Sequence, residues 1–86
     1  MTYSKKELRH LRRRIGATIH DARCRDRISI RRLAEATQLS FRKIDAYELG
    51  RGEMKLEHLF RISIVLGIGL ADLLEGPKEK PPLLLF

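Results

Sequence analysis

The spacing of its apolar residues restricts this chain to α-helices. Between residues 8 and 22, apolar side chains recur at steps of three or four residues. Such steps place side chains on one face of a helix, whereas alternate residues share a face in a strand. The sequence therefore predicts a helix from about Ser4 to Arg25. Its inward face consists of Leu8, Leu11, Ile15, Ile19 and Ala22.

Four further helices are predicted by the same criterion. A second helix begins at Ser29 and ends near Gln38, and Ser40 caps a third that ends at Gly50. A fourth, over 56–66, stops at Gly67, and a short fifth covers 70–74. Because no segment shows the alternation of a strand, we expect an all-α, compact five-helix bundle. The fourth helix is apolar around most of its circumference, so we expect it to be the central core element; its apolar residues are Leu56, Leu59, Phe60, Ile62, Ile64, Val65 and Leu66.

Size and composition exclude several classes of protein. The chain has 86 residues, of which 43% are hydrophobic and 34% are charged. This suits one small packed domain and leaves no room for a two-domain enzyme. A single cysteine, Cys24, can form neither an internal disulfide nor a zinc finger. The longest apolar run, from Ile62 to Ala71, is too short to span a bilayer. We expect a cytoplasmic protein, associated with the nucleoid and not with membranes.

Charge is concentrated at the start of the chain. The net charge is +7, and residues 1–34 contain eleven basic but only three acidic side chains. Such asymmetry is typical of proteins that bind polyanions, nucleic acid first and an anionic membrane surface second. An ordinary solvated helix surface is the alternative. A lipid-bound first helix is disfavoured, because its apolar face is needed to cover the fourth helix.

The second and third helices begin with an unusual chemistry. Arg31 follows Ser29, and Arg42 and Lys43 follow Ser40, with no Glu or Gln at either third position to complete a capping box. Helix N-termini favour acidic side chains, so basic ones there suggest an external anion. Free amides, a serine hydroxyl and nearby cations together would hold a phosphate. The short turn between the helices fits a helix-turn-helix, although two basic starts could arise by chance in an arginine-rich chain.

Motifs in this order resemble the helix-turn-helix domain of Cro/CI-type phage repressors, the XRE family. The resemblance runs from Ile15 to Leu74 and includes SxxxLA at Ser29–Ala34 and LSxxxIxxYExG at Leu39–Gly50. It implies a bundle of the lambda-repressor type, with a DNA-binding domain over 1–75. It also implies that the third helix enters the major groove while the preceding helix grips the backbone.

The resemblance, with the charges above, assigns candidate DNA contacts. Arg42 is the best specificity residue, because its fork can span O6 and N7 of guanine. Phe41 either presses on a thymine methyl or packs inside its own domain. Departures from the family pattern are Ile30 in place of a glutamine, and Gln38 where glycine is usual, which requires a left-handed or reshaped turn. The base-contact candidates are Phe41, Arg42, Asp45 and Ala46. The phosphate candidates are Ser29, Arg31, Ser40, Lys43, Arg51 and Lys55. Arg23 and Glu48 match a structural ion pair between the first and third helices.

The function expected from this resemblance is a sequence-specific, double-stranded DNA-binding transcriptional repressor. One short recognition helix reads few base pairs, so we expect a homodimer on a near-palindromic operator. The tail, 76–86, ends in four apolar residues that suit a dimer or partner contact. An antitoxin-like module whose tail docks into a second protein is the alternative. We expect no enzymatic activity, no cofactor and no metal; His20 and Cys24, even with His10 or His58, make a weak metal site. The candidates for dimer or partner contact are Leu70, Leu73, Leu83, Leu84, Leu85 and Phe86.

Overall fold

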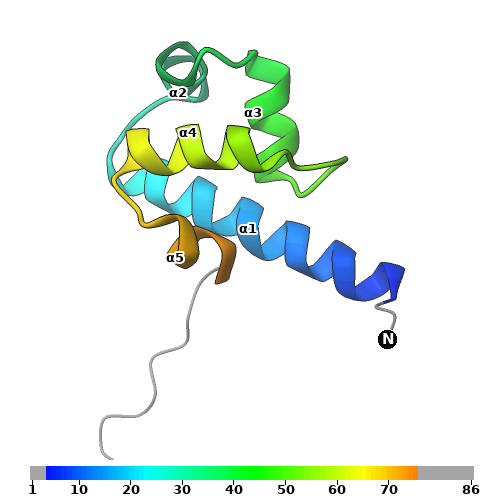
Figure 1. The fold of residues 1–86 in the computed structure, drawn as a ribbon. Coiled ribbons are helices and arrows are strands. Elements are labelled where there is room, and N and C mark those ends of the chain that lie inside the picture. The colour runs from blue at the N-terminus through cyan, green and yellow to red at the C-terminus, as the bar shows by residue number, and fades with distance from the viewer. Residues whose placement is uncertain (1–3, 76–86) are drawn as a thin grey trace, which may run out of the picture.

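Five α-helices make up the fold, as the sequence predicts (Figure 1). The structure is a computed structural model that describes residues 4–75. No strand occurs in this range, so the all-α five-helix prediction is confirmed. The expected tail contacts, Leu83–Phe86, lie outside the described residues. The helices are α1 (Lys5–Arg25), α2 (Ile30–Thr37), α3 (Phe41–Glu48), α4 (Leu56–Leu66) and α5 (Leu70–Glu75).

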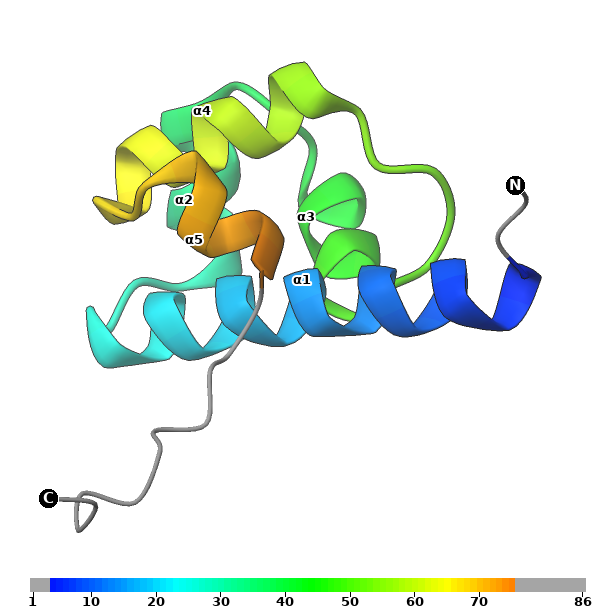
Figure 2. The same ribbon diagram turned by 60° about the horizontal axis from the view of Figure 1, so that its bottom comes forward.

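The long helix α1 is the base on which the others are assembled. It begins with a capping box, in which the Ser4 hydroxyl accepts from the Glu7 amide and the Glu7 carboxylate accepts from the Ser4 amide. Its middle packs against α3, α4 and α5, while α2 packs against α3 and α4. Figure 2 shows α1 running beneath the other four helices. The arrangement leaves α2 and α3 together at one side of the molecule.

The hydrophobic core draws on all five helices. In α1, Ile15, Ile19 and Ala22 of the predicted inward face are buried, whereas Leu11 of the same face is 37% exposed. Leu73 of α5 is fully buried, because its side chain closes the core where α5 packs on α1 and α4. The prediction that Leu73 lies at a dimer or partner surface is therefore wrong, whereas Leu70 is half-buried. The fully buried side chains are Ile19, Leu33, Ile44, Tyr47, Ile62 and Leu73.

Helix α4 contributes to the core with one face only, although it is apolar around most of its circumference. Leu59, Ile62 and Leu66 point into the core, where α2 and α5 cover them. On the other face Leu56, Phe60 and Ile64 are 61%, 51% and 64% exposed. These three stand at four-residue steps, so they form one outward stripe, which we name the α4 apolar stripe.

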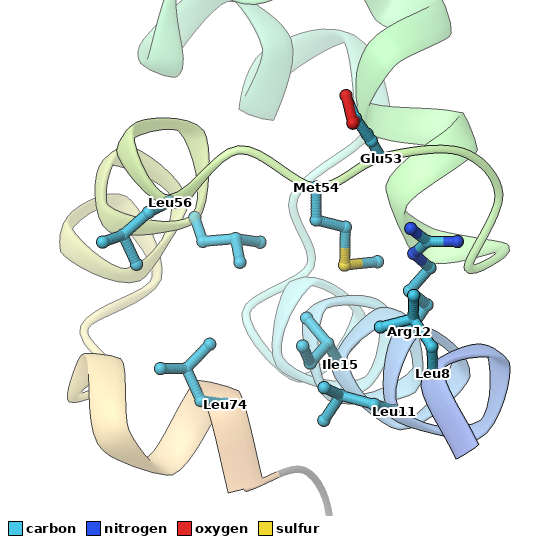
Figure 3. A pocket seen from close by; sticks show the side chains of 9 residues that line it. Leu8, Leu11, Arg12, Ile15, Glu53, Met54, Leu56 and Leu74 are labelled. Carbon is cyan, nitrogen blue, oxygen red and sulfur yellow. The ribbon is translucent and has the colours of Figure 1, made fainter. Parts of the chain in front are cut away.

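A shallow apolar groove lies between α1, α4 and α5 (Figure 3). Its volume is about 420 Å³, and Leu11 and Ile15 of α1 face Leu74 of α5 across it. Met54, in the loop before α4, covers one end. The remaining lining residues are Leu8, Arg12, Glu53, Leu56 and Leu59.

Candidate DNA-binding surface

Helices α2 and α3 form a helix-turn-helix through a turn of three residues, 38–40. Gln38 adopts the left-handed conformation, with φ 61° and ψ 35°, which confirms the prediction made for this position. The Gln38 amide donates to the Glu35 carbonyl at 3.2 Å, and the Leu39 amide donates to the Ala34 carbonyl at 3.0 Å. These bonds satisfy the last carbonyls of α2 in the way that a C-terminal glycine normally would.

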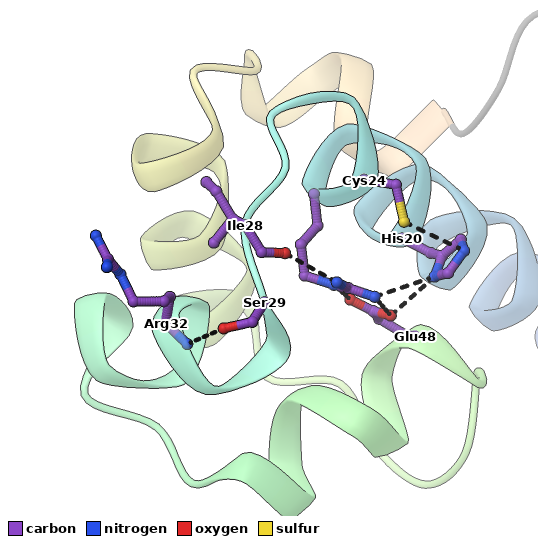
Figure 4. Close-up of polar contacts among 7 residues, drawn as sticks. His20, Cys24, Ile28, Ser29, Arg32 and Glu48 are labelled. Atoms are coloured by element: carbon purple, nitrogen blue, oxygen red, sulfur yellow. Dashed lines mark hydrogen bonds and ion pairs between the residues drawn. The ribbon is translucent and has the colours of Figure 1, made fainter.

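Both helices begin with a serine cap. The Ser29 hydroxyl oxygen accepts from the Arg32 amide at 3.0 Å, and that of Ser40 accepts from the Lys43 amide at 3.1 Å (Figure 4 for Ser29). Both serines are exposed. The backbone amides that directly follow the two serines, at 30–31 and 41–42, have no hydrogen-bond acceptor within the helix, as is general for the first turn of a helix. Neither first turn contains an acidic residue, so each start presents free amides and positive charge to solvent.

The outer face of α3 is available to a ligand. Ile44 and Tyr47 are buried and hold the helix to the core, while Arg42 and Lys43 are exposed. Phe41 is 51% exposed, which favours the base-contact interpretation over packing inside its own domain. Ala46 is half-buried on α3, and Asp45, also half-buried, lines a hollow beside α1. Of the remaining phosphate candidates, Arg31, Arg51 and Lys55 are exposed.

A hydrogen-bonded relay joins α3 to the start of α4. The Tyr47 hydroxyl accepts from the Lys55 amide at 3.2 Å and lies 2.7 Å from Nδ1 of His58. Burial and the neighbouring cations, Lys55 first and then Lys43 and Arg61, lower the pKa of His58. The imidazole is therefore neutral at pH 7 and forms a hydrogen bond with the Tyr47 hydroxyl. This arrangement fixes Lys55 beside the C-terminal half of α3.

The predicted ion pair between α1 and α3 is present. Arg23 Nε and Nη2 donate to the two carboxylate oxygens of Glu48, at 2.5 and 3.0 Å (Figure 4). Arg23 Nη1 donates to the Ile28 carbonyl at 2.9 Å, and His20 Nδ1 lies 3.0 Å from the Glu48 carboxylate. The side chains of Arg23 and Glu48 are only 13% and 6% exposed. Hydrogen bonding to Glu48 raises the pKa of Arg23, so the guanidinium stays charged and ties α3 to α1 and to the α1–α2 loop.

Two glycines allow the end of α3 to lie directly on α1. A Cβ at Gly16 would stand 2.4 Å from the Tyr47 carbonyl oxygen. Gly50 has φ +69° and ends α3, as predicted, and a Cβ there would stand 2.9 Å from Cα of Arg13. Backbone therefore meets backbone at this contact. The tilt of α3, and with it the direction of its outer face, is set by this contact and by the Arg23–Glu48 pair.

Comparison with known proteins relates this helix-turn-helix to a regulator. Two similar solved structures are both of the clp gene regulator ClgR from Corynebacterium glutamicum, and both are 34% identical to this chain. Their TM-scores are 0.71 and 0.70, each match covers 76% of this chain, and 69% and 84% of the respective ClgR chains are covered. The chain belongs to the ClgR family. No protein-family model matches the sequence, and no curated protein matches it either.

Two polar contacts beside the helix-turn-helix, made by His20 and by His58, are not predicted from the sequence. The sequence suggests His20 only as a weak metal ligand with Cys24, whose sulfur lies 3.6 Å from Nε2 of His20. Its other nitrogen instead contacts Glu48, and no three possible ligands gather anywhere in residues 4–75. His20 stands one turn before Arg23, and this spacing could have revealed it. The Tyr47–His58 contact spans a loop and has no such signal.

The described helices were compared with the length and hydropathy of membrane-spanning helices. None of them, over residues 4–75, combines the length and the apolar character that crossing a bilayer demands.

Proposed function

We propose that this chain is a sequence-specific, double-stranded DNA-binding transcriptional repressor of the Cro/CI type. The observation that carries the proposal is the exposed outer face of α3, with Arg42 and Lys43 exposed to solvent beside a serine-capped helix start that contains no acidic residue. Its similarity to ClgR, a clp gene regulator, supports a role in transcription. No cofactor enters the proposal.

In this proposal α3 lies in the major groove and the start of α2 holds the backbone. Arg42 pairs with guanine O6 and N7, a contact that contributes about 1 to 3 kcal/mol of discrimination. Phe41 meets a thymine methyl, while Asp45 and Ala46 flank the bases. Phosphates are bound by the helix starts and by the loop that follows α3; the residues are Ser29, Arg31, Ser40, Lys43, Arg51 and Lys55.

The proposed active unit is a homodimer on a near-palindromic operator. An α3 of eight residues reads few base pairs, and a two-fold axis would place two such helices about one helical turn apart. Because Leu73 is buried, we assign the proposed dimer surface to Leu70 and to the α4 apolar stripe. Phe60→Asp should then shift the protein to a monomer in sedimentation equilibrium, and an unchanged dimer would reject this surface.

Selection of bound fragments from random DNA, followed by fluorescence anisotropy, tests the DNA-binding proposal. Arg42→Ala should relax preference at one or two base positions, at a cost of about 1 to 3 kcal/mol on the preferred site. Lys43→Ala should weaken binding to all sequences alike and lower the salt slope by about one. If selection enriches no sequence, or if both variants bind like the wild type, the assignment of α3 is wrong.

The C-terminal residues Leu83–Phe86 remain proposed contacts of a dimer or a second protein. Deletion of residues 81–86 should reduce self-association or abolish partner capture without changing the salt slope of DNA binding, because apolar docking releases no counterions. A deletion that leaves self-association and capture intact would remove these residues from the proposal.

A further inference from the structure

Four basic side chains on the N-terminal half of α1 have no role in the surface described above. Lys6, Arg9, His10 and Arg13 are all exposed and line one shallow depression. They stand at steps of three and four residues, so they share one face of the helix. We name this group the α1 basic stripe.

None of the ion pairs seen between residues 4 and 75 involves the α1 basic stripe. The ion pairs in residues 4–75 join His20 and Arg23 to Glu48, Arg25 to Asp26, and Arg61 to Glu57, so none of them involves the stripe. The nearby Glu7 is engaged by its own cap at Ser4. Like charges three or four residues apart destabilise a helix. Helix α4 shows the usual arrangement, because Arg61 follows Glu57 by four residues.

The α1 basic stripe lies on the same face of α1 as the residues that contact α3. From Arg13 the same face runs on through Gly16, which touches the end of α3, to His20 and Arg23, which contact Glu48. The backbone of Arg13 also touches Gly50, the residue before the phosphate candidate Arg51. Figure 2 shows the first turns of α1 projecting beyond α3 and beyond the loop after it. The stripe is therefore continuous with the proposed DNA-binding surface.

We infer that the α1 basic stripe binds phosphates of the DNA backbone next to those held by the helix-turn-helix. The inference rests on the proposed function and extends its contact surface. Lys6 and Arg13 are seven residues apart, or roughly 10 Å along the helix axis. Successive phosphates of one strand advance about 3.4 Å along the duplex axis, so the stripe matches a run of about three phosphates. The α1 contact reads no bases; it adds affinity and orients α3.

Salt titration with matched variants tests this inference. The probe is a fluorescein-labelled random-sequence duplex several helical turns long, and anisotropy gives the binding constant between about 50 and 200 mM NaCl. Arg9→Gln and Arg13→Gln should each lower the slope of log K against log salt by about 0.9, the value for one phosphate contact. Arg25→Gln is the matched control. Arg25 is an exposed arginine at the other end of α1, twelve residues after Arg13 and about 120° away around the helix, and the slope of this variant should stay at the wild-type value.

Further outcomes separate the stripe from net charge and from the helix-turn-helix. Arg13→Lys should restore the wild-type slope, and circular dichroism should show that every variant is folded. Equal decreases for Arg13→Gln and Arg25→Gln would overturn the inference, because they would report total charge only. If the slopes of Arg9→Gln and Arg13→Gln are unchanged while that of Lys43→Ala is lowered, the α1 basic stripe does not bind phosphates. The proposed function would still hold in that case. A wild type that does not bind the duplex would overturn both.

Discussion

Removal of the Glu48 carboxylate tests how α3 is held. In Glu48→Ala the Arg23 guanidinium remains almost buried, with the Ile28 carbonyl and, at 3.4 Å, Nδ1 of His20 as its remaining partners. Breaking a buried pair by deleting one partner costs about 3 to 5 kcal/mol, and we take about 3 because Arg23 keeps these contacts. For a domain of this size, each kcal/mol lowers the melting temperature by about 4 to 8 °C. The variant should therefore melt about 12 to 24 °C below the wild type.

Thermal and urea unfolding followed by circular dichroism measure this effect, with Glu57→Ala as the control. Glu57 also pairs with an arginine, but its side chain is 70% exposed, so its loss should cost about 0.5 kcal/mol or less. The double variant Arg23→Met, Glu48→Leu should regain most of the stability, because apolar side chains can replace a buried pair. If Glu48→Ala is no less stable than Glu57→Ala, the ion pair does not anchor α3.

Three further substitutions probe the scaffold of the site. Gly16→Ala forces a methyl group against the Tyr47 carbonyl oxygen and should lower the free energy of unfolding by about 2 kcal/mol, measured by urea denaturation; a gain would refute backbone contact there. Ser40→Ala removes the cap of α3 and should cost about 1 kcal/mol in the same assay, so an unchanged midpoint would count against the cap. Because the folded pKa of His58 is lowered, its contribution to stability is complete above about pH 6.5 and is lost as the pH falls below that value. The melting temperature of His58→Gln should therefore fall less than that of the wild type between pH 7.5 and 5.5, and parallel curves would contradict the role of this histidine.

Helix positions could be predicted from sequence because periodicity and caps are local signals. Ser29, Ser40 and Gly50 mark helix ends in the sequence and do so in the structure. The left-handed conformation of Gln38 was also predictable, since a tight turn requires it at that position whatever residue stands there.

Burial of the later helices could not be predicted in the same way. Leu73 and Phe60 are both large apolar residues of short segments, yet Leu73 is fully buried and Phe60 is 51% exposed. Which of them faces the core depends on how α4 and α5 pack on α1. This packing is a long-range property, and the spacing of apolar residues within one segment does not reveal it. For the same reason the Tyr47–His58 contact had no local signal.

The way in which α3 is anchored has a consequence for how binding specificity can change. Its buried side chains, Ile44 and Tyr47, and its ion pair through Glu48 all lie on the inner side, whereas Phe41 and Arg42 take no part in the core. Substitutions at these two outer positions should therefore leave folding intact. A duplicated copy of such a gene could acquire a new target sequence through one or two codon changes, without first passing through an unstable intermediate.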